Sequence, residues 1–285
     1  MRFSCSDYTF PLLSRDRRFA LVKLLGFTHV DLGLFERTPD LAPSHLLARP
    51  KSFIAQLRRN LKSAGLRVAD VFLQTGATPE ISAANDADPA VRAHNHKLFA
   101  LAVELCGAVG CHHLTGLPGV FHDGADRSGE LALAAEEAAW RQEKAAEAEI
   151  TYSIEAHIGS ICPDVASTRA LLHAVPALSL TLDYTHFVAT GIPSREIHPL
   201  LRFASHIHVR GGAPNRLQTA VNENEVDYAG MVSRLAKQAY SGFIAVEYVY
   251  TEWQQCNRTD NVTETLLLRR LLERNQNGRV KTHST

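Results

Sequence analysis

Residues 179–187 read SLTLDYTHF, an apolar run that ends on Asp183 and His186. Leucines and β-branched threonine in so short a run are typical of a buried β-strand. Carboxylate and imidazole groups are costly to bury without a partner, so a buried strand that ends on both indicates a site at its carboxyl end. The interpretation depends on whether the other predicted strands also end on carboxylate or imidazole side chains.

Short runs of the same kind recur along the chain. Besides residues 179–184, they occupy 2–6, 29–35, 67–73, 111–117, 150–156, 206–210 and 243–249. The stretches between them have helical spacing and cover 15–26, 51–65, 91–110, 130–149, 164–175, 194–204, 228–240 and 261–275. Several of these stretches end on glycine, and Pro89 and Pro163 are placed like first-turn prolines. Strands and helices are therefore expected to alternate.

Regular alternation of strands and helices predicts a parallel sheet, because each helix is the crossover between two parallel strands. Eight such units in about 250 residues match a closed (β/α)₈ TIM barrel. An open doubly wound sheet is the main alternative, and it would often carry a GxGxxG or GxxxxGK loop, which this sequence lacks. We therefore predict an α/β fold with one barrel domain over residues 1–275 and a polar tail over 276–285.

The composition is that of an ordinary globular chain, with 285 residues of which 45% are hydrophobic and 21% charged. Lys plus Arg and Asp plus Glu both number 30, so the net charge gives no reason to expect nucleic acid or an anionic membrane as a partner. Five cysteines without a CxxC pair argue for reduced, packed thiols. No signal peptide or membrane span is apparent, so we expect a cytoplasmic protein with a small-molecule partner.

Active sites of (β/α)₈ barrels lie at the carboxyl ends of the strands. The last four predicted strands end on Glu155 and His157, on Asp183 and His186, on His206 and His208, and on Glu247. Each side chain alone has an ordinary explanation as a helix cap or a hydrogen-bonded histidine. Gathered at one barrel mouth, they would repel one another or stay unsatisfied without a cation. The set therefore predicts one divalent metal ion.

The donor atoms indicate the kind of metal. Three carboxylates and one imidazole are mostly hard ligands, which suit Mn²⁺, Mg²⁺ or Co²⁺ better than a thiolate-rich zinc site, although Zn²⁺ stays open. Residues two apart on a strand share a face, so His206 and His208 can both line the barrel, with His208 nearer the mouth. We therefore assign His208 to the metal and place His206 one layer deeper.

The motifs IEAH, LDYTH, HIHV and AVEY, in this order and spacing, resemble those of the sugar isomerase/epimerase superfamily of xylose isomerase-like barrels. That superfamily includes ketose 3-epimerases, inosose dehydratases and dehydroshikimate dehydratases. The resemblance implies that one catalytic ion, with Mn²⁺ the first choice, is bound by Glu155, Asp183, His208 and Glu247. It also implies that Glu155 and Glu247 are the acid and base that move a proton beside a carbonyl, through a metal-stabilised enediolate.

The resemblance further implies several contacts with the substrate. His186 of the DxxH motif would reach the substrate, with His157 beside it in the pocket. Several members of the family bind a substrate hydroxyl with an arginine after strand seven; here HVRGGAPNRLQ offers Arg210 and Arg216, and Arg216 is our candidate. Position alone adds further candidates. Trp253 and Tyr250, after the last strand, are candidates to stack on a sugar ring, with packing as the alternative, and Asp70, Gln74 and His113 lie near strand ends, with a core or capping role as the alternative.

These features favour an isomerase or epimerase of a sugar or a sugar-derived hydroxy-carbonyl compound. The altered segment after strand seven favours the alternative of a lyase with the same site, such as a dehydratase, a decarboxylase or a sugar C-deglycosylating subunit. An abasic-site endonuclease would need further histidine ligands on the early strands, and a non-enzymic binding module would need no metal. A homo-oligomer or a partner subunit is compatible with the resemblance.

Overall fold

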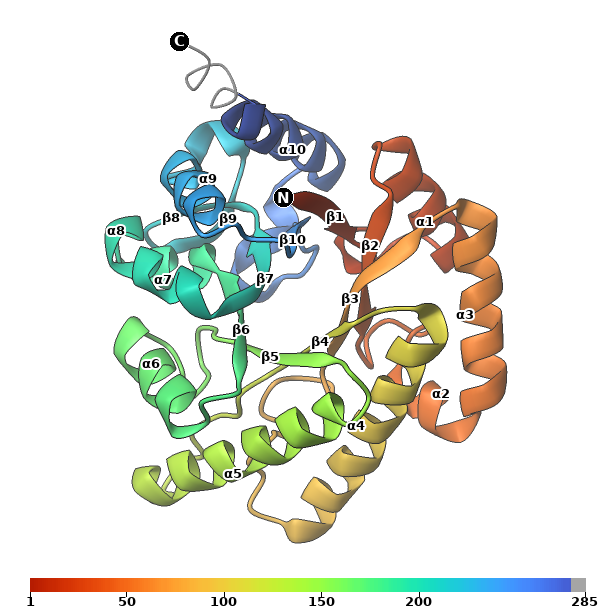
Figure 1. The fold of residues 1–285 in the computed structure, drawn as a ribbon, viewed down its shortest axis with the longest axis vertical. Helices are drawn as coiled ribbons and strands as arrows, with labels where there is room; N and C mark the ends of the chain where they lie inside the picture. The colour runs from red at the N-terminus through yellow and green to blue at the C-terminus, as the bar shows by residue number, and fades with distance from the viewer. Residues whose placement is uncertain (278–285) are drawn as a thin grey trace.

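The fold is a closed barrel of parallel strands surrounded by helices (Figure 1). The structure is a computed structural model and describes residues 1–277. The barrel strands are β1 (Arg2–Ser6), β2 (His29–Leu34), β3 (Arg67–Leu73), β4 (His113–Gly116), β5 (Thr151–Glu155), β6 (Ser179–Asp183), β7 (Ala204–Val209) and β10 (Phe243–Val246). The longer helices are α1 (Arg15–Leu24), α3 (Pro50–Ala64), α4 (Pro89–Val109), α5 (Arg127–Ala146), α6 (Val165–Ala174), α9 (Tyr228–Lys237) and α10 (Asn261–Asn277). The predicted (β/α)₈ barrel is confirmed.

The strands follow one another around the barrel in chain order, and the last closes on the first. β1 pairs with β10, with Arg2 opposite Phe243, and both strands lie together at the centre of Figure 1. β6 pairs with β7 so that Asp183 lies opposite His208. Because all these strands are parallel, their carboxyl ends gather at one mouth, where the side chains that end the strands meet.

Short-range chemistry explains where a connecting helix begins and ends. Helix α4 starts at Pro89, behind Asp88, whose carboxylate accepts a hydrogen bond from the main chain of the first turn. An acidic residue followed by proline is a favourable start for a helix. The carboxylate accepts a hydrogen bond from a first-turn N–H that lacks a partner in the helix, and proline has no N–H that would need a partner. The helix stops at Gly110, whose φ of 70° is a left-handed conformation that glycine adopts without strain.

Other details of the predicted helices differ from the structure. Pro163 precedes helix α6 rather than standing in its first turn, because Asp164 takes the capping position. The predicted helix over 194–204 is the short α8 (Ser194–Ile197) followed by the 3-10 helix η2 (His198–Phe203), since the proline in η2 has no N–H for an α-helical bond. Helix α10 runs to Asn277, and residues 278–285 of the predicted tail lie outside the described residues.

Some elements near the mouth were not predicted. The short helix α7 (Tyr184–Ala189) follows β6 directly and contains His186. Strands β8 (Gly211–Ala213) and β9 (Arg216–Thr219) form an antiparallel hairpin after β7. A Cβ on Gly211 would lie 2.3 Å from the carbonyl oxygen of Thr219, so only glycine allows the hairpin to close so tightly. The helix α2 (Pro43–Ala48) and the 3-10 helices η1 (Asp7–Thr9), η3 (Val221–Glu223) and η4 (Trp253–Arg258) complete this set.

One large hydrophobic core joins the barrel strands to the helices packed around them. All five cysteines are buried and free, as the sequence predicted. Within residues 1–277, no helix is both long enough and apolar enough to cross a membrane.

Candidate active site

Four strand ends bring the predicted metal ligands to the barrel mouth. Glu155 and Asp183 are the last residues of β5 and β6, His208 lies one residue before the end of β7, and Glu247 follows β10. Their exposed fractions do not exceed 5%, so these ionisable groups have lost most of their contact with bulk water. Such groups must find charged or hydrogen-bonding partners within the protein.

Three of the four side chains form one cluster of donor atoms. His208 Nδ1 lies 2.6 Å from Glu155 Oε1 and 3.4 Å from Glu247 Oε1. Ligands about 2.0–2.2 Å from one metal ion lie about 3 Å apart from each other, so these separations suit a shared ion. Glu247 Oε2 is buried and accepts no hydrogen bond from any residue between 1 and 277. The residues present therefore fit a divalent metal ion.

Asp183 lies beside this cluster but has other partners. Its Oδ1 accepts hydrogen bonds from the main-chain N–H and the hydroxyl of Thr185, at 2.8 and 2.7 Å. Its Oδ2 accepts a hydrogen bond of 2.6 Å from Arg210 Nη2. Asp183, Glu155 and His186 each offer a donor atom within 4.8 Å of the others. The Oδ2 atom of Asp183 is the oxygen left for an ion, but the guanidinium of Arg210 contacts it.

The electrostatic environment of the cluster shifts the pKa values of the two glutamates in opposite directions. Burial raises the pKa of Glu247 to about 7, and the charge of Glu155 adds to this rise. Burial alone would raise the pKa of Glu155 too, but the charge and hydrogen bond of His208 bring it below the usual value. For His208 burial opposes the charged form, yet Glu247 and Glu155 raise its pKa to about 10. A positive charge is therefore favoured at the centre of these carboxylates, where a proton and a metal ion are alternatives.

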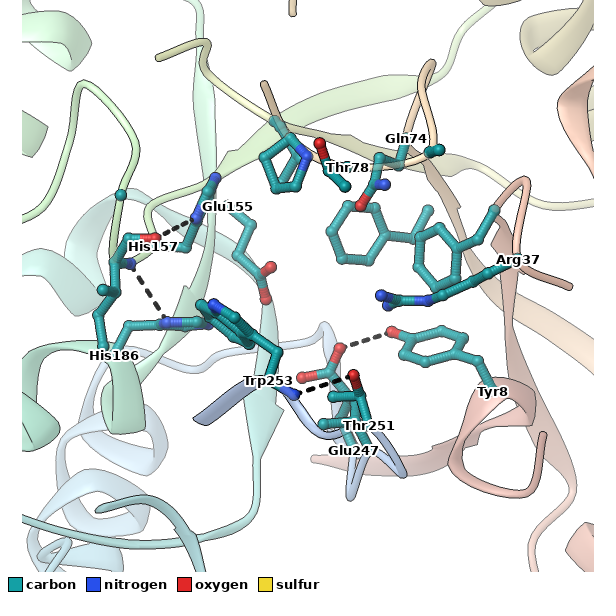
Figure 2. Close-up of a pocket in the computed structure, with 18 of the residues that line it drawn as sticks. Tyr8, Arg37, Gln74, Thr78, Glu155, His157, His186, Glu247, Thr251 and Trp253 are labelled. Carbon is teal, nitrogen blue, oxygen red and sulfur yellow. Dashed lines mark hydrogen bonds between the residues drawn. The ribbon is translucent and has the colours of Figure 1, made fainter. Parts of the chain in front are cut away.

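A cavity of about 400 Å³ opens above the cluster (Figure 2). Figure 2 shows the Glu155 and Glu247 carboxylates facing the middle of this cavity from different strands. Its apolar wall consists of Phe35, Phe72, Ala77, Pro79, Leu117, Ile158 and Val249. A volume of this size holds a small molecule, and the polar and charged residues that share the lining with this apolar wall can fix the orientation of such a ligand.

Three of the predicted substrate-binding residues line this cavity. His157 and His186 are both buried, with ring centroids 5.9 Å apart, and Trp253 is partly exposed beside His186 (Figure 2). Burial lowers the pKa of His186 to about 4, so its imidazole is neutral and can accept as well as donate a hydrogen bond. Gln74 also lines the cavity, whereas Tyr250 does not.

The structure does not bring Arg216, His113 or Asp70, which were also predicted contacts, to the cavity. Arg216 lies exposed at the start of β9 and forms a salt bridge of 2.9 Å with Glu223. His113 begins β4, at the opposite end of the barrel from the mouth, and its imidazole contacts Asp70 at 2.6 Å. A side chain at the amino end of a parallel strand points away from the site, so the sequence placed His113 at the wrong end of its strand.

A family model described as xylose isomerase-like TIM barrel matches residues 19–271. The chain belongs to this family. By sequence, no curated protein matches it. Among solved structures, the chain is similar to an L-ribulose 3-epimerase, at 16% identity and a TM-score of 0.78 over 100% of this chain and 98% of that one.

Two further structures show how widely the xylose isomerase-like barrel is shared. A probable 3-DHS dehydratase from Bacillus anthracis is 14% identical, with a TM-score of 0.69 over 94% of this chain and 99% of that one. An AP endonuclease of family 2 from Brucella melitensis is 20% identical, with a TM-score of 0.70 over 94% and 98%. At such identities the likeness concerns the fold, and the reaction must be argued from the site.

Below the mouth, further ionisable residues fill the interior of this xylose isomerase-like barrel. His206 Nε2 lies 2.6 Å from Asp31 Oδ2, and His113 Nδ1 lies 2.6 Å from Asp70 Oδ1. All four residues are buried and lie outside the lining of the cavity. Because each carboxylate already has an imidazole partner, we regard this group as a hydrogen-bond network that fixes the strands to one another.

Among the cavity residues that the sequence analysis did not single out are Tyr8 and Arg37, and it offered Arg210 only as the alternative to Arg216. Tyr8 lies in η1, two residues past the end of β1, where residues that face the mouth are expected. Arg210 is two residues after His208, so the period of two that placed His208 at the mouth also places Arg210 there. For Arg37, an exposed loop residue, no signal in the sequence distinguishes it from other surface arginines.

Tyr8→Phe is expected to lower turnover about tenfold, because the Tyr8 hydroxyl donates a buried hydrogen bond of 2.7 Å to Glu247 Oε1. A hydrogen bond to a charged group contributes about 1.5–3 kcal/mol, and 1.4 kcal/mol is a factor of ten. Steady-state kinetics measure the effect, with Tyr250→Phe as the matched control, since Tyr250 is 44% exposed and outside the cavity lining. Equal turnover of both variants would contradict the role of Tyr8.

Proposed function

We propose that the protein is a divalent-metal-dependent isomerase or epimerase that acts on a sugar or a sugar-derived hydroxy-carbonyl compound. The observation that supports this is the pair of buried carboxylates, Glu155 and Glu247, which face one cavity and both contact His208. Their environments push their pKa values in opposite directions, as expected for one group that removes a proton and one that returns it. The similar structure named as an L-ribulose 3-epimerase agrees with this proposal.

In this proposal, a divalent ion held by Glu155, Asp183, His208 and Glu247 supplies stabilisation of the negative charge that develops on the substrate oxygen. Glu155 and Glu247 act on the same carbon, one removing its proton and the other returning a proton to the opposite face. His186 and His157 orient the hydroxyl groups, and Trp253 covers the substrate at the mouth. Mn²⁺ is our first choice of ion, with Mg²⁺, Co²⁺ and Zn²⁺ as alternatives that the ligand set accepts.

Solvent deuterium tests this proposal. The protein is incubated with a panel of ketoses and keto-sugar derivatives in D₂O with Mn²⁺, and products are analysed by NMR and mass spectrometry. An isomerase or epimerase incorporates one deuterium at the carbon next to the carbonyl, because its proton leaves to a carboxylate that exchanges with solvent. The absence of deuterium from every recovered compound would overturn the assignment.

A lyase with the same catalytic residues is the second candidate, and the arginines of the cavity favour it. Both Arg37 and Arg210 line the cavity, so a substrate with a carboxylate could find a cationic partner there. The same proton removal would then be followed by loss of water, carbon dioxide or an aglycone, as in a dehydratase, a decarboxylase or a sugar C-deglycosylating subunit. Product mass separates the two candidates, since isomerisation in H₂O leaves the mass unchanged.

A further inference from the structure

Arg210 contacts the groups that would hold the ion. It follows β7 directly and is 3% exposed. Its Nη2 donates to Asp183 Oδ2 at 2.6 Å, its Nε donates to the hydroxyl of Thr185 at 3.0 Å, and its Nη1 lies 3.6 Å from Glu247 Oε2. A buried guanidinium thus stands between two of the four predicted metal ligands, where its charge offsets theirs.

The contact with Asp183 involves the oxygen that an ion needs. Asp183 Oδ1 is already engaged by two hydrogen bonds from Thr185. Oδ2 is the oxygen that remains, and it is the one that the guanidinium contacts. A divalent ion and a guanidinium at one carboxylate oxygen also repel each other strongly in a buried site.

We infer that Arg210 and the divalent ion are alternative partners of Asp183, so that Arg210 must leave this carboxylate before the ion gains its fourth protein ligand. This inference rests on the metal site of the proposed function. It makes Arg210 a residue that controls metal affinity, in addition to any contact that it makes with substrate. Such a role distinguishes it from the other arginine of this segment, Arg216, which is exposed on the hairpin.

The surroundings of Arg210 allow its side chain to move while its main chain stays in place. Its main-chain N–H and carbonyl are both hydrogen-bonded to the hydroxyl of Tyr228. The following Gly211 is packed against the main chain of β9, which fixes the hairpin. Arg210 also lines the cavity, so the guanidinium that leaves Asp183 has open volume beside it. The displacement therefore needs only side-chain rotation.

The test is a titration of purified protein with Mn²⁺, in which the EPR signal of free Mn²⁺ gives the dissociation constant. The dissociation constant for Mn²⁺ is expected to be at least about tenfold lower for Arg210→Gln and Arg210→Met than for the native protein. This factor corresponds to the loss of one hydrogen bond to a charged group, the bond from Arg210 to Asp183. Arg216→Gln is the matched control, because it removes the same charge from the exposed hairpin, and its affinity is expected to stay native. Mn²⁺ should also raise the melting temperature of the Arg210 variants more than that of the native protein.

The outcomes separate this inference from the proposed function. If Arg210→Gln binds Mn²⁺ no more tightly than the native protein, Arg210 does not compete and the inference falls, while the proposed function stands. If only the Arg210 variants bind Mn²⁺, the inference holds and metal-dependent catalysis by the native chain falls. If no protein of the set binds Mn²⁺, both fall. A crystal structure with Mn²⁺ that keeps the Arg210 contact to Asp183 at hydrogen-bond distance would also overturn the inference.

Discussion

Glu247→Gln is expected to lower the rate of deuterium exchange by about 10²–10⁴-fold, the range that general acid–base catalysis contributes. The amide of glutamine keeps the size and the oxygen of the side chain but cannot take up the proton. Glu247 is buried and lies beside Glu155 and His208 at the cavity, where its carboxylate faces the position that we propose for the substrate. Single-turnover exchange measured at saturating Mn²⁺ separates loss of the proton carrier from loss of metal.

The control for this variant is Glu104→Gln, which changes an exposed carboxylate on the outer helix α4. It is expected to exchange deuterium at the native rate. The metal content of Glu247→Gln is measured alongside, because Glu247 is also a predicted ligand. Native exchange by a metal-loaded Glu247→Gln would remove Glu247 from the acid–base pair.

Removal of the metal is expected to abolish turnover and to lower the free energy of unfolding. A ligand that binds only the folded state stabilises it by about 2.7 kcal/mol at about 100 times its dissociation constant, so the chelated protein should lose about this amount. The carboxylates at the mouth are then left with His208 and Arg210 as their balancing charges. Urea unfolding with and without EDTA measures the stability, and kinetics after return of each metal measure the activity.

The control for this experiment is to return metal ions to the chelated protein and to measure whether activity recovers, because EDTA can also inhibit the assay itself. Activity that returns with Mn²⁺, Co²⁺ or Mg²⁺ but not with Ca²⁺ would agree with a compact site of three carboxylates and one imidazole. Full turnover in the presence of excess EDTA, with metal absent by elemental analysis, would contradict a metal-dependent reaction.

The barrel could be predicted because each of its strands is recognisable from its local sequence alone. Each barrel strand is a short apolar run between helical stretches, so counting the runs was sufficient to predict eight strands in a closed barrel. The parts that were missed are short or depend on tertiary contacts, such as helix α7 and the hairpin of β8 and β9. The hairpin closes on a glycine packed against the neighbouring strand, a contact that exists only after folding.

The candidate site was predictable where strand ends carry its residues. Glu155, Asp183, His208 and Glu247 end consecutive strands of the barrel, and the parallel arrangement then brings them to one mouth. The partners of Asp183 could not be predicted in this way, because a flexible arginine side chain can reach several carboxylates from the same main-chain position. Of the two arginines that the segment after β7 offers, Arg216 was the candidate, whereas the strand period places Arg210 at the mouth.

The pairing of β1 with β10 has a consequence for synthesis of the chain on the ribosome. Of the eight barrel strands β1 is made first, yet its partner β10 at residues 243–246 is made last, so both edges of the sheet stay open until all the other barrel strands have been made. Unpaired strand edges are templates for aggregation. The nascent chain therefore needs protection until β10 docks, and the same event delivers Glu247 to Glu155 and His208. The barrel and the candidate site are completed together, so a chain that lacks β10 has neither.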